Sequence, residues 1–104
     1  MKVVREESRE GQSVLHVAGA LRAPLNGDLR RRVGTLLDRG VRSILLDIGR
    51  VGELDAAGLG ELVRLHTMAG AVKGTLRVRH ATGKVRTLLA LSGLCELLGT
   101  DGPC

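Results

Sequence analysis

The 104-residue chain contains no phenylalanine, tyrosine or tryptophan, and this absence restricts both its core and its ligands. The core must be filled by aliphatic side chains, and the usual stacking groups for bases and sugars are missing. We therefore do not expect nucleic acid as a partner. Some arginines could still contact phosphate groups, but the simpler expectation is that they form a solvated face; these are Arg30, Arg31, Arg77 and Arg79.

Cysteines and long apolar runs are also scarce. Cys95 and Cys104 lack CxxC spacing, and charged residues follow soon after the N-terminus, so we expect neither a disulfide framework nor a secretory signal. No apolar run approaches the roughly 18 residues that a membrane span requires. These absences predict a cytoplasmic protein without a membrane segment. Its formal net charge of +5 favours acidic partners in general terms.

The length and composition predict one domain covering residues 1–104. A chain of this size buries roughly two-thirds of the surface that its unfolded form exposes, so it can fold without metal or disulfides. Its 15 glycines are about twice the usual share and indicate many tight turns. We expect residues 98–104 to form a frayed tail, as is common at chain ends.

The stretch 45–59 is the expected seat of function. An apolar run from Ser43 to Ile48, broken only by Asp47, is typical of a strand covered on both faces and central in a partly parallel sheet. After a short loop, the carboxylate of Asp55 can accept a hydrogen bond from the N–H of Ala57 or Gly58 and oppose the helix dipole. A helix start at the carboxyl end of a strand is a common functional position.

The rest of the chain alternates between strand and helix patterns. Strands are expected at 2–7 and 13–18, paired as a hairpin, and at 75–79 near a sheet edge. A helix capped by Asn26 should end near Gly40, and one capped by Thr82 should end before Gly93, with a short segment at 94–98. Between them, a helix ending around Gly70 should bury one stripe of side chains, comprising Leu59, Leu62, Val63, His66 and Ala69.

Catalytic and metal-binding patterns are weak. The three histidines, His16, His66 and His80, lack the spacing that sets two ligands on one face. Ser92 and Cys95 have no evident base nearby in sequence. Asp47 and Asp55 could form a carboxylate pair, although a capping role already accounts for Asp55. Gly83-Lys84 lacks the surroundings of a phosphate loop. We expect no enzyme activity, no cofactor and no metal.

The segment from Leu46 to Leu59 resembles the STAS family, named for sulfate transporters and anti-sigma factor antagonists. The family signature is an apolar strand followed by Asp-Ser-Ser-Gly-Leu, and this chain has Asp55-Ala56-Ala57-Gly58-Leu59. Residues 19–21 resemble the Gly-Glu-Leu turn of the family, 70–76 its glycine-containing entry to the next strand, and 85–94 its closing helix. The resemblance implies an α/β fold with a mixed sheet of four or five strands and helices mainly on one face.

The resemblance also implies a function and a departure from it. In anti-sigma factor antagonists of the family, the first residue after the motif aspartate is a serine that a partner kinase phosphorylates, which switches binding off. Here Ala56 and Ala57 replace the hydroxyl residues, so neither can accept the added charge and acceptor oxygens of a phosphate. We expect binding without phosphorylation at the motif, unless the switch has moved to Thr82 or Ser92.

The implied partner is an anti-sigma factor or a related regulatory protein. The expected contact surface is formed by Asp55, Ala56, Ala57, Gly58 and Leu59. Arg22 and Glu53 depart from the family pattern on its rim, where charges affect association rate and partner choice. Two alternatives are the STAS subunit of a phospholipid ABC transport complex, docking on its ATPase, and a nucleotide-binding regulatory domain. The sequence leaves a homodimer open.

Overall fold

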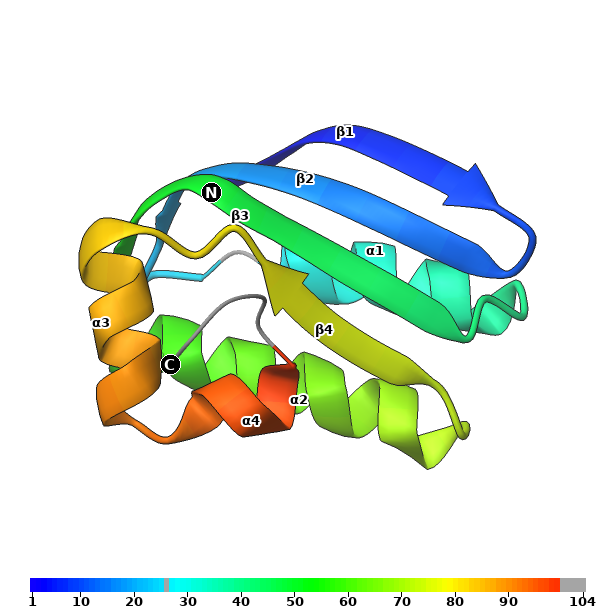
Figure 1. Ribbon diagram of the computed structural model, residues 1–104. Coiled ribbons are helices and arrows are strands. Elements are labelled where there is room, and N and C mark those ends of the chain that lie inside the picture. The colour runs from blue at the N-terminus through cyan, green and yellow to red at the C-terminus, as the bar shows by residue number, and fades with distance from the viewer. Residues whose placement is uncertain (26, 100–104) are drawn as a thin grey trace.

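The computed structural model describes residues 1–25 and 27–99 and has a four-stranded sheet with helices packed beneath it (Figure 1). In the order β1-β2-β3-β4, β1 (Lys2–Arg9) is antiparallel to β2 (Gln12–Leu21), while β2, β3 (Ser43–Leu54) and β4 (Thr75–Arg79) are parallel. The helices are α1 (Asp28–Asp38), α2 (Ala56–Ala71), α3 (Gly83–Leu91) and α4 (Leu94–Leu98). The expected single α/β domain with a mixed sheet is confirmed.

The helices cover one face of the sheet, and this corrects the expectation for β3. Ile44, Leu46 and Ile48 are buried against the helices, whereas Leu45 and Asp47 point to the other face and are partly exposed. Leu45 keeps the run apolar although its side chain lies on the open face. The continuous run therefore does not mean that both faces of the strand are covered. The strand is nevertheless an inner strand of a partly parallel sheet, as predicted, and it is parallel to both of its neighbours.

The expected loop after Ile48 is wrong, because β3 continues to Leu54. Residues 50–54 pair with the last residues of β2, from Ala18 to Leu21. Residues 19–21, which resembled a turn, are therefore also strand. Two register shifts interrupt this part of the ladder. Such irregular pairing does not require strict alternation of apolar side chains, which explains why the sequence reads as a loop.

The helix boundaries agree with the expected punctuation, with some differences in detail. Gly27 occupies the cap position of α1, while Asn26 lies outside the described residues. Thr82 holds the cap position of α3, but its side chain makes no capping hydrogen bond. Leu91, the last residue of α3, is 81% exposed. Gly93, in a left-handed conformation, separates α3 from α4 as predicted.

The buried stripe of α2 differs from the expected one by a rotation of the helix. Glu61, Leu62, Leu65 and Ala69 are buried, whereas Val63 and His66 are only partly so. The difference follows from the first turn, where Gly58 rather than Leu59 packs inward.

The end of the chain also differs from expectation. Leu98 ends α4 and is fully buried, so it is not frayed; residues 100–104 lie outside the described residues, and a frayed tail there stays a prediction. Cys95 is buried, and Cys104 lies outside the described residues, so the expectation that the chain has no disulfide framework stays a prediction. None of the described helices combines the length and apolarity needed to cross a membrane.

Candidate functional site

Asp55 joins three segments of backbone at the carboxyl end of β3. Its Oδ1 accepts a hydrogen bond from the N–H of Gly58 at 2.8 Å, which caps α2 as predicted. Its Oδ2 accepts a second from the N–H of Ala23 at 3.0 Å, and its own N–H donates to the carbonyl of Leu21 at 3.4 Å. One carboxylate therefore fixes the start of α2 against the segment that follows β2.

These hydrogen bonds favour the ionised form of Asp55. The backbone N–H of Gly58, followed by that of Ala23, holds the pKa of the Asp55 carboxyl below its usual value. The negative charge also faces the positive end of the α2 dipole. The contact with Ala23 was not foreseen from the sequence, because the two residues are 32 positions apart.

Gly58 permits a close approach between α2 and the end of β2. A Cβ atom at this position would lie 2.0 Å from the carbonyl oxygen of Leu21 and 2.7 Å from Cδ1 of Leu54. No side chain fits at such distances, so the glycine of the motif is required by packing. Gly58 is buried and acts by bringing the backbones together rather than by presenting surface.

The two alanines of the motif lie at the first turn of α2. Ala56 is exposed, while Ala57 and Leu59 are partly buried. Arg22 and Glu53, singled out separately on the expected rim, form an ion pair in which Arg22 Nε lies 3.1 Å from Glu53 Oε2. Both side chains are more than half exposed.

A groove of about 780 Å³ adjoins this surface, between the end of β3 and α3. Its apolar wall includes Leu54, Leu88 and the exposed Leu91, and Lys84 adds a cation. The sequence did not place α3 beside Asp55, because only the fold brings the two together. The groove is lined by Arg22, Gly52, Glu53, Leu54, Asp55, Gly83, Lys84, Thr87, Leu88 and Leu91.

The hydroxyl groups considered for regulation come from α3 and its two cap residues, Thr82 and Ser92. Thr87 lines the groove, and its Oγ1 donates to the carbonyl of Gly83 at 3.2 Å. Thr82 is exposed, and Ser92 Oγ donates to the carbonyl of Leu89 at 3.0 Å. Thr87 was missed from the sequence, although it lies three residues after Lys84 and four before Leu91, a spacing that places all three on one side of a helix.

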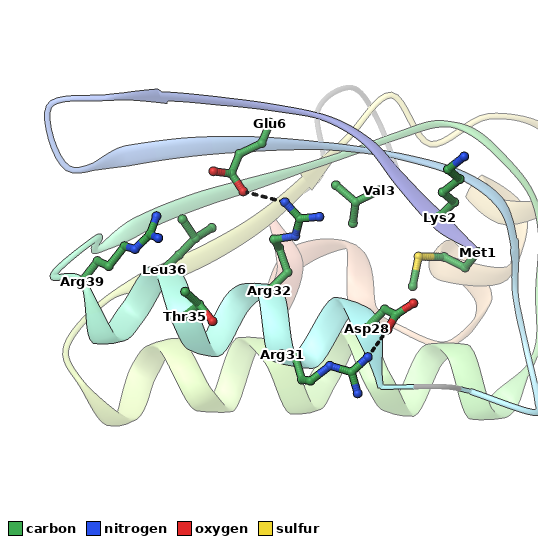
Figure 2. A pocket seen from close by; sticks show the side chains of 10 residues that line it. All are labelled: Met1, Lys2, Val3, Glu6, Asp28, Arg31, Arg32, Thr35, Leu36 and Arg39. Carbon is green, nitrogen blue, oxygen red and sulfur yellow. Dashed lines mark hydrogen bonds and ion pairs between the residues drawn. The ribbon is translucent and has the colours of Figure 1, made fainter.

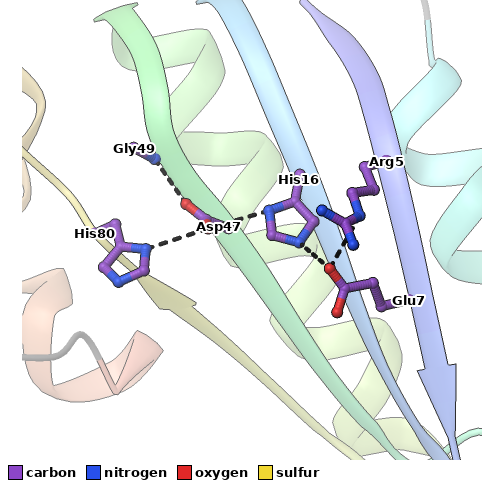
Figure 3. Close-up of polar contacts among 6 residues, drawn as sticks. All are labelled: Arg5, Glu7, His16, Asp47, Gly49 and His80. Atoms are coloured by element: carbon purple, nitrogen blue, oxygen red, sulfur yellow. Dashed lines mark hydrogen bonds and ion pairs between the residues drawn. The ribbon is translucent and has the colours of Figure 1, made fainter.

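A second polar cluster lies on the open face of the sheet, where the strands bring two histidines onto one aspartate (Figure 3). The Nδ1 atoms of His16 and His80 each lie 3.1 Å from Asp47 Oδ2, and Gly49 N–H donates to Oδ1. His16 Nε2 lies 3.1 Å from Glu7 Oε1. This cluster could not be predicted from sequence spacing, because its members come from three strands and a strand end.

The contacts of Asp47 act in opposite directions on its acidity. Burial alone would raise the pKa of the Asp47 carboxyl, but the Gly49 N–H and the contact with His80 outweigh it, so the pKa is lowered. The cluster links β2, β3 and the residue after β4 on the face that no helix covers (Figure 3).

The residues considered for chemistry are not assembled into a shared centre. Asp47 and Asp55 bind different partners, and His66 lies partly buried on α2. Within residues 1–25 and 27–99, no group of three histidine, cysteine or acidic side chains is arranged to hold a metal ion.

The four arginines considered for phosphate contact come from different elements. Arg30 and Arg31 belong to α1, and Arg77 and Arg79 to β4. Arg30 is engaged with Glu61, which is only 4% exposed, through contacts of 3.1 to 3.3 Å with both carboxylate oxygens. The burial of this acid was not predicted, because Glu61 lies outside the stripe of the helix that the sequence predicts to be buried.

Comparison with known proteins yields several structures of the same fold. An anti-sigma factor antagonist from Mycobacterium paratuberculosis is 21% identical, with a TM-score of 0.79 over 95% of this chain and 84% of that one. The anti-sigma factor antagonist SpoIIAA is 20% identical in its unphosphorylated form, with a TM-score of 0.77 over 94% and 87% of the two chains. Bacillus SpoIIAA in its phosphorylated form is 19% identical, with a TM-score of 0.70 over 94% and 90%.

Identities this low establish the fold alone. A search of curated protein sequences finds no significant match. The family model described as "Mlab, STAS domain" matches residues 4–99, which is nearly the whole chain. The chain therefore belongs to the STAS family.

Proposed function

We propose that this STAS domain is a non-catalytic interaction module that binds an anti-sigma factor or a related regulatory protein. The observation that carries the proposal is the exposed Ala56 at the start of α2, beside a groove whose rim holds the 81% exposed Leu91. Its structural neighbours include anti-sigma factor antagonists, which supports this class of partner. A cytoplasmic location stays a prediction.

The surface suits a partner that approaches closely and inserts an apolar side chain. Ala56 and Ala57 leave the backbone of the first turn accessible, and Asp55 holds that turn in place. Leu88 and Leu91 can contact an apolar group, while Lys84 offers a cation to an acidic one. Fully desolvated apolar anchors commonly supply most of the affinity of an interface.

The absence of hydroxyl groups from the motif bears on how binding of the partner is regulated. SpoIIAA exists in phosphorylated and unphosphorylated forms. In this chain alanines occupy the two positions after Asp55, and we infer that binding is not switched there. Regulation could instead act through Thr87, the hydroxyl residue that lines the groove together with Leu88 and Leu91.

The test is to replace Ala56 by Glu and measure binding to the partner captured by affinity purification and identified by mass spectrometry. The bulky charge should abolish binding without unfolding the domain, since an acidic residue in the first turn of a helix favours the dipole. Ala71→Glu is the matched control, because Ala71 is also exposed and lies at the other end of α2. Unchanged binding by Ala56→Glu would place the interface elsewhere.

The regulatory part is tested separately with a cognate anti-sigma kinase and ATP. The unmodified protein should incorporate no phosphate at 56 or 57, whereas Ala56→Ser should become a substrate. Phosphate on Thr82, Thr87 or Ser92 of the unmodified protein would show that the switch has moved. Two results would favour the alternatives: selective capture of the ATPase of a transport complex, or heat on titration with GTP or ATP.

A further inference from the structure

A second groove, of about 710 Å³, lies between the edge strand β1 and α1 (Figure 2). Its lining shares no residue with the groove beside Asp55. It is formed by Met1, Lys2, Val3, Glu6, Asp28, Arg31, Arg32, Thr35, Leu36 and Arg39. Nothing in the proposed function uses this surface.

An irregularity in β1 shapes the groove. The register with β2 shifts between Val3 and Arg5, and such a bulge changes which residues point to which face. Val3 and Glu6 consequently both line the groove, although they are three residues apart. Arg5 and Glu7 instead belong to the cluster with His16 on the open face (Figure 3). The groove thus lies between β1 and α1, with side chains of both elements in its lining.

The groove is positively charged. Four cationic and two acidic side chains line it, a net charge of +2. Arg32 Nη1 lies 3.3 Å from Glu6 Oε1, and Arg31 pairs with Asp28. These ion pairs are exposed and therefore weak, so an incoming carboxylate can compete for their arginines. Lys2 and Arg39 form no ion pair with the described part of the chain, and they lie at opposite ends of the groove with Arg32 between them (Figure 2).

The backbone of β1 supplies a second kind of recognition. Because β1 is at the edge of the sheet, alternate residues direct their N–H and C=O groups away from β2. In the free protein such a row of donors and acceptors bonds to water, and an extended peptide strand can replace that water along the whole row. Nucleic acid would supply charge but not this pairing, and the chain has no aromatic side chain on which bases could stack.

We propose that this groove binds an extended acidic peptide segment of a partner protein, which adds to β1 as a further strand. Its carboxylates contact Lys2, Arg32 and Arg39, while its backbone pairs with the free edge of β1. A second copy of this chain fits less well, because two chains of net charge +5 repel each other. The site is independent of the surface around Ala56.

The test uses a fluorescein-labelled peptide of alternating glutamate and valine with 8 residues, the length of β1. Anisotropy should report saturable binding to the full chain, and a peptide with lysine in place of glutamate should not bind. Arg39→Glu should weaken binding about tenfold by charge reversal. Arg50→Glu is the matched control, because Arg50 is an exposed arginine on β3 outside this groove.

Two further measurements separate strand addition from general attraction of charge. Glu6→Gln should tighten binding about twofold to threefold, since it frees Arg32 for the peptide. Amide hydrogen exchange in β1 should slow when the peptide binds, while exchange in β4 should not change. Any of three results would overturn the proposal. They are equal binding of the lysine and glutamate peptides, equal loss of affinity in Arg39→Glu and Arg50→Glu, and unchanged amide exchange in β1. Tighter binding of a short oligothymidylate at the same residues would do so too, in favour of a nucleic-acid ligand.

Discussion

Arg22 Nε lies 3.1 Å from Glu53 Oε2, so two charges that depart from the family pattern neutralise each other. Arg22 follows the last residue of β2, and Glu53 is the last residue but one of β3. Parallel pairing of these strand ends places the two side chains together. The pair therefore adds no net charge to the rim of the candidate surface. Substitution of one partner changes the net charge of the rim, whereas substitution of both leaves it unchanged.

This pairing predicts the result of a double-mutant cycle. Arg22→Ala and Glu53→Ala should each lower the free energy of unfolding slightly, with a coupling of about 0.5 kcal/mol, because both side chains are well exposed. Partner binding should respond more to either single substitution than to the double one, mainly through the association rate. Urea unfolding and stopped-flow binding measure the two effects. A coupling near zero would show that the pair is not maintained in solution.

The second prediction concerns the glycine of the motif. Gly58→Ala should destabilise the domain by about 2 kcal/mol or more, since overpacking a tight contact typically costs 1–3 kcal/mol and the added Cβ would meet the carbonyl oxygen of Leu21 at 2.0 Å. Gly60→Ala, two residues later on the same helix, meets nothing within 4 Å. It should stabilise by up to about 1 kcal/mol through helix propensity. Thermal and urea unfolding of both variants provide the measurement.

The opposite signs make the comparison informative. If Gly58→Ala were as stable as the wild type, the first turn of α2 would have to lie farther from β2 than described. Loss of stability in Gly60→Ala would show that its side of α2 is covered, in conflict with its exposure.

Asp55 and Gly58 show which roles can be predicted from the sequence and which cannot. The capping role of Asp55 follows from local chemistry, because the acceptor and the N–H of Gly58 are three residues apart. The steric role of Gly58 depends on Leu21, which only the sheet brings near. In the same way, alternation predicts β4 well, whereas the last part of β3 was mistaken for a loop because its pairing with β2 is irregular and its residues include glycines and charges.

Long-range polar contacts were the least predictable feature. His16 and His80 share Asp47 although 64 positions separate the histidines in sequence. Glu61 interrupts an apolar stripe and finds Arg30 on another helix. No pattern of spacing within one element reveals such partners, since each side chain taken alone resembles an ordinary surface residue.

The buried Glu61 gives the third prediction. Arg30→Ala should lower the free energy of unfolding by about 2 kcal/mol, because it leaves a buried carboxylate without its main partner; the loss is smaller than for a fully buried pair, since the Arg30 side chain is 41% exposed. Arg31→Ala removes an equal charge from the next residue, whose ion pair with Asp28 is exposed. It should cost no more than about 0.5 kcal/mol. Equal losses in the two variants, measured by urea unfolding, would mean that Glu61 does not depend on Arg30.

The fourth prediction is a pH dependence that originates at Asp55. Its pKa is lowered in the folded protein by the N–H groups of Gly58 and Ala23, so its contribution to stability is fully present above the unfolded value of about 3.9 and is lost as the pH falls through the lower folded value. Asp55→Asn keeps a capping oxygen but cannot ionise. The variant should therefore be less stable than the wild type near about pH 7, and the difference should shrink below about pH 4.

The measurement is the urea midpoint of both proteins across this pH range, with Asp38→Asn as a control on an exposed carboxylate at the end of α1. A constant difference between Asp55→Asn and the wild type would mean that the loss comes from altered capping geometry and not from the charge. Because the same hydrogen bonds hold the turn that carries Ala56, partner binding should weaken in Asp55→Asn over the same pH range in which its stability is reduced.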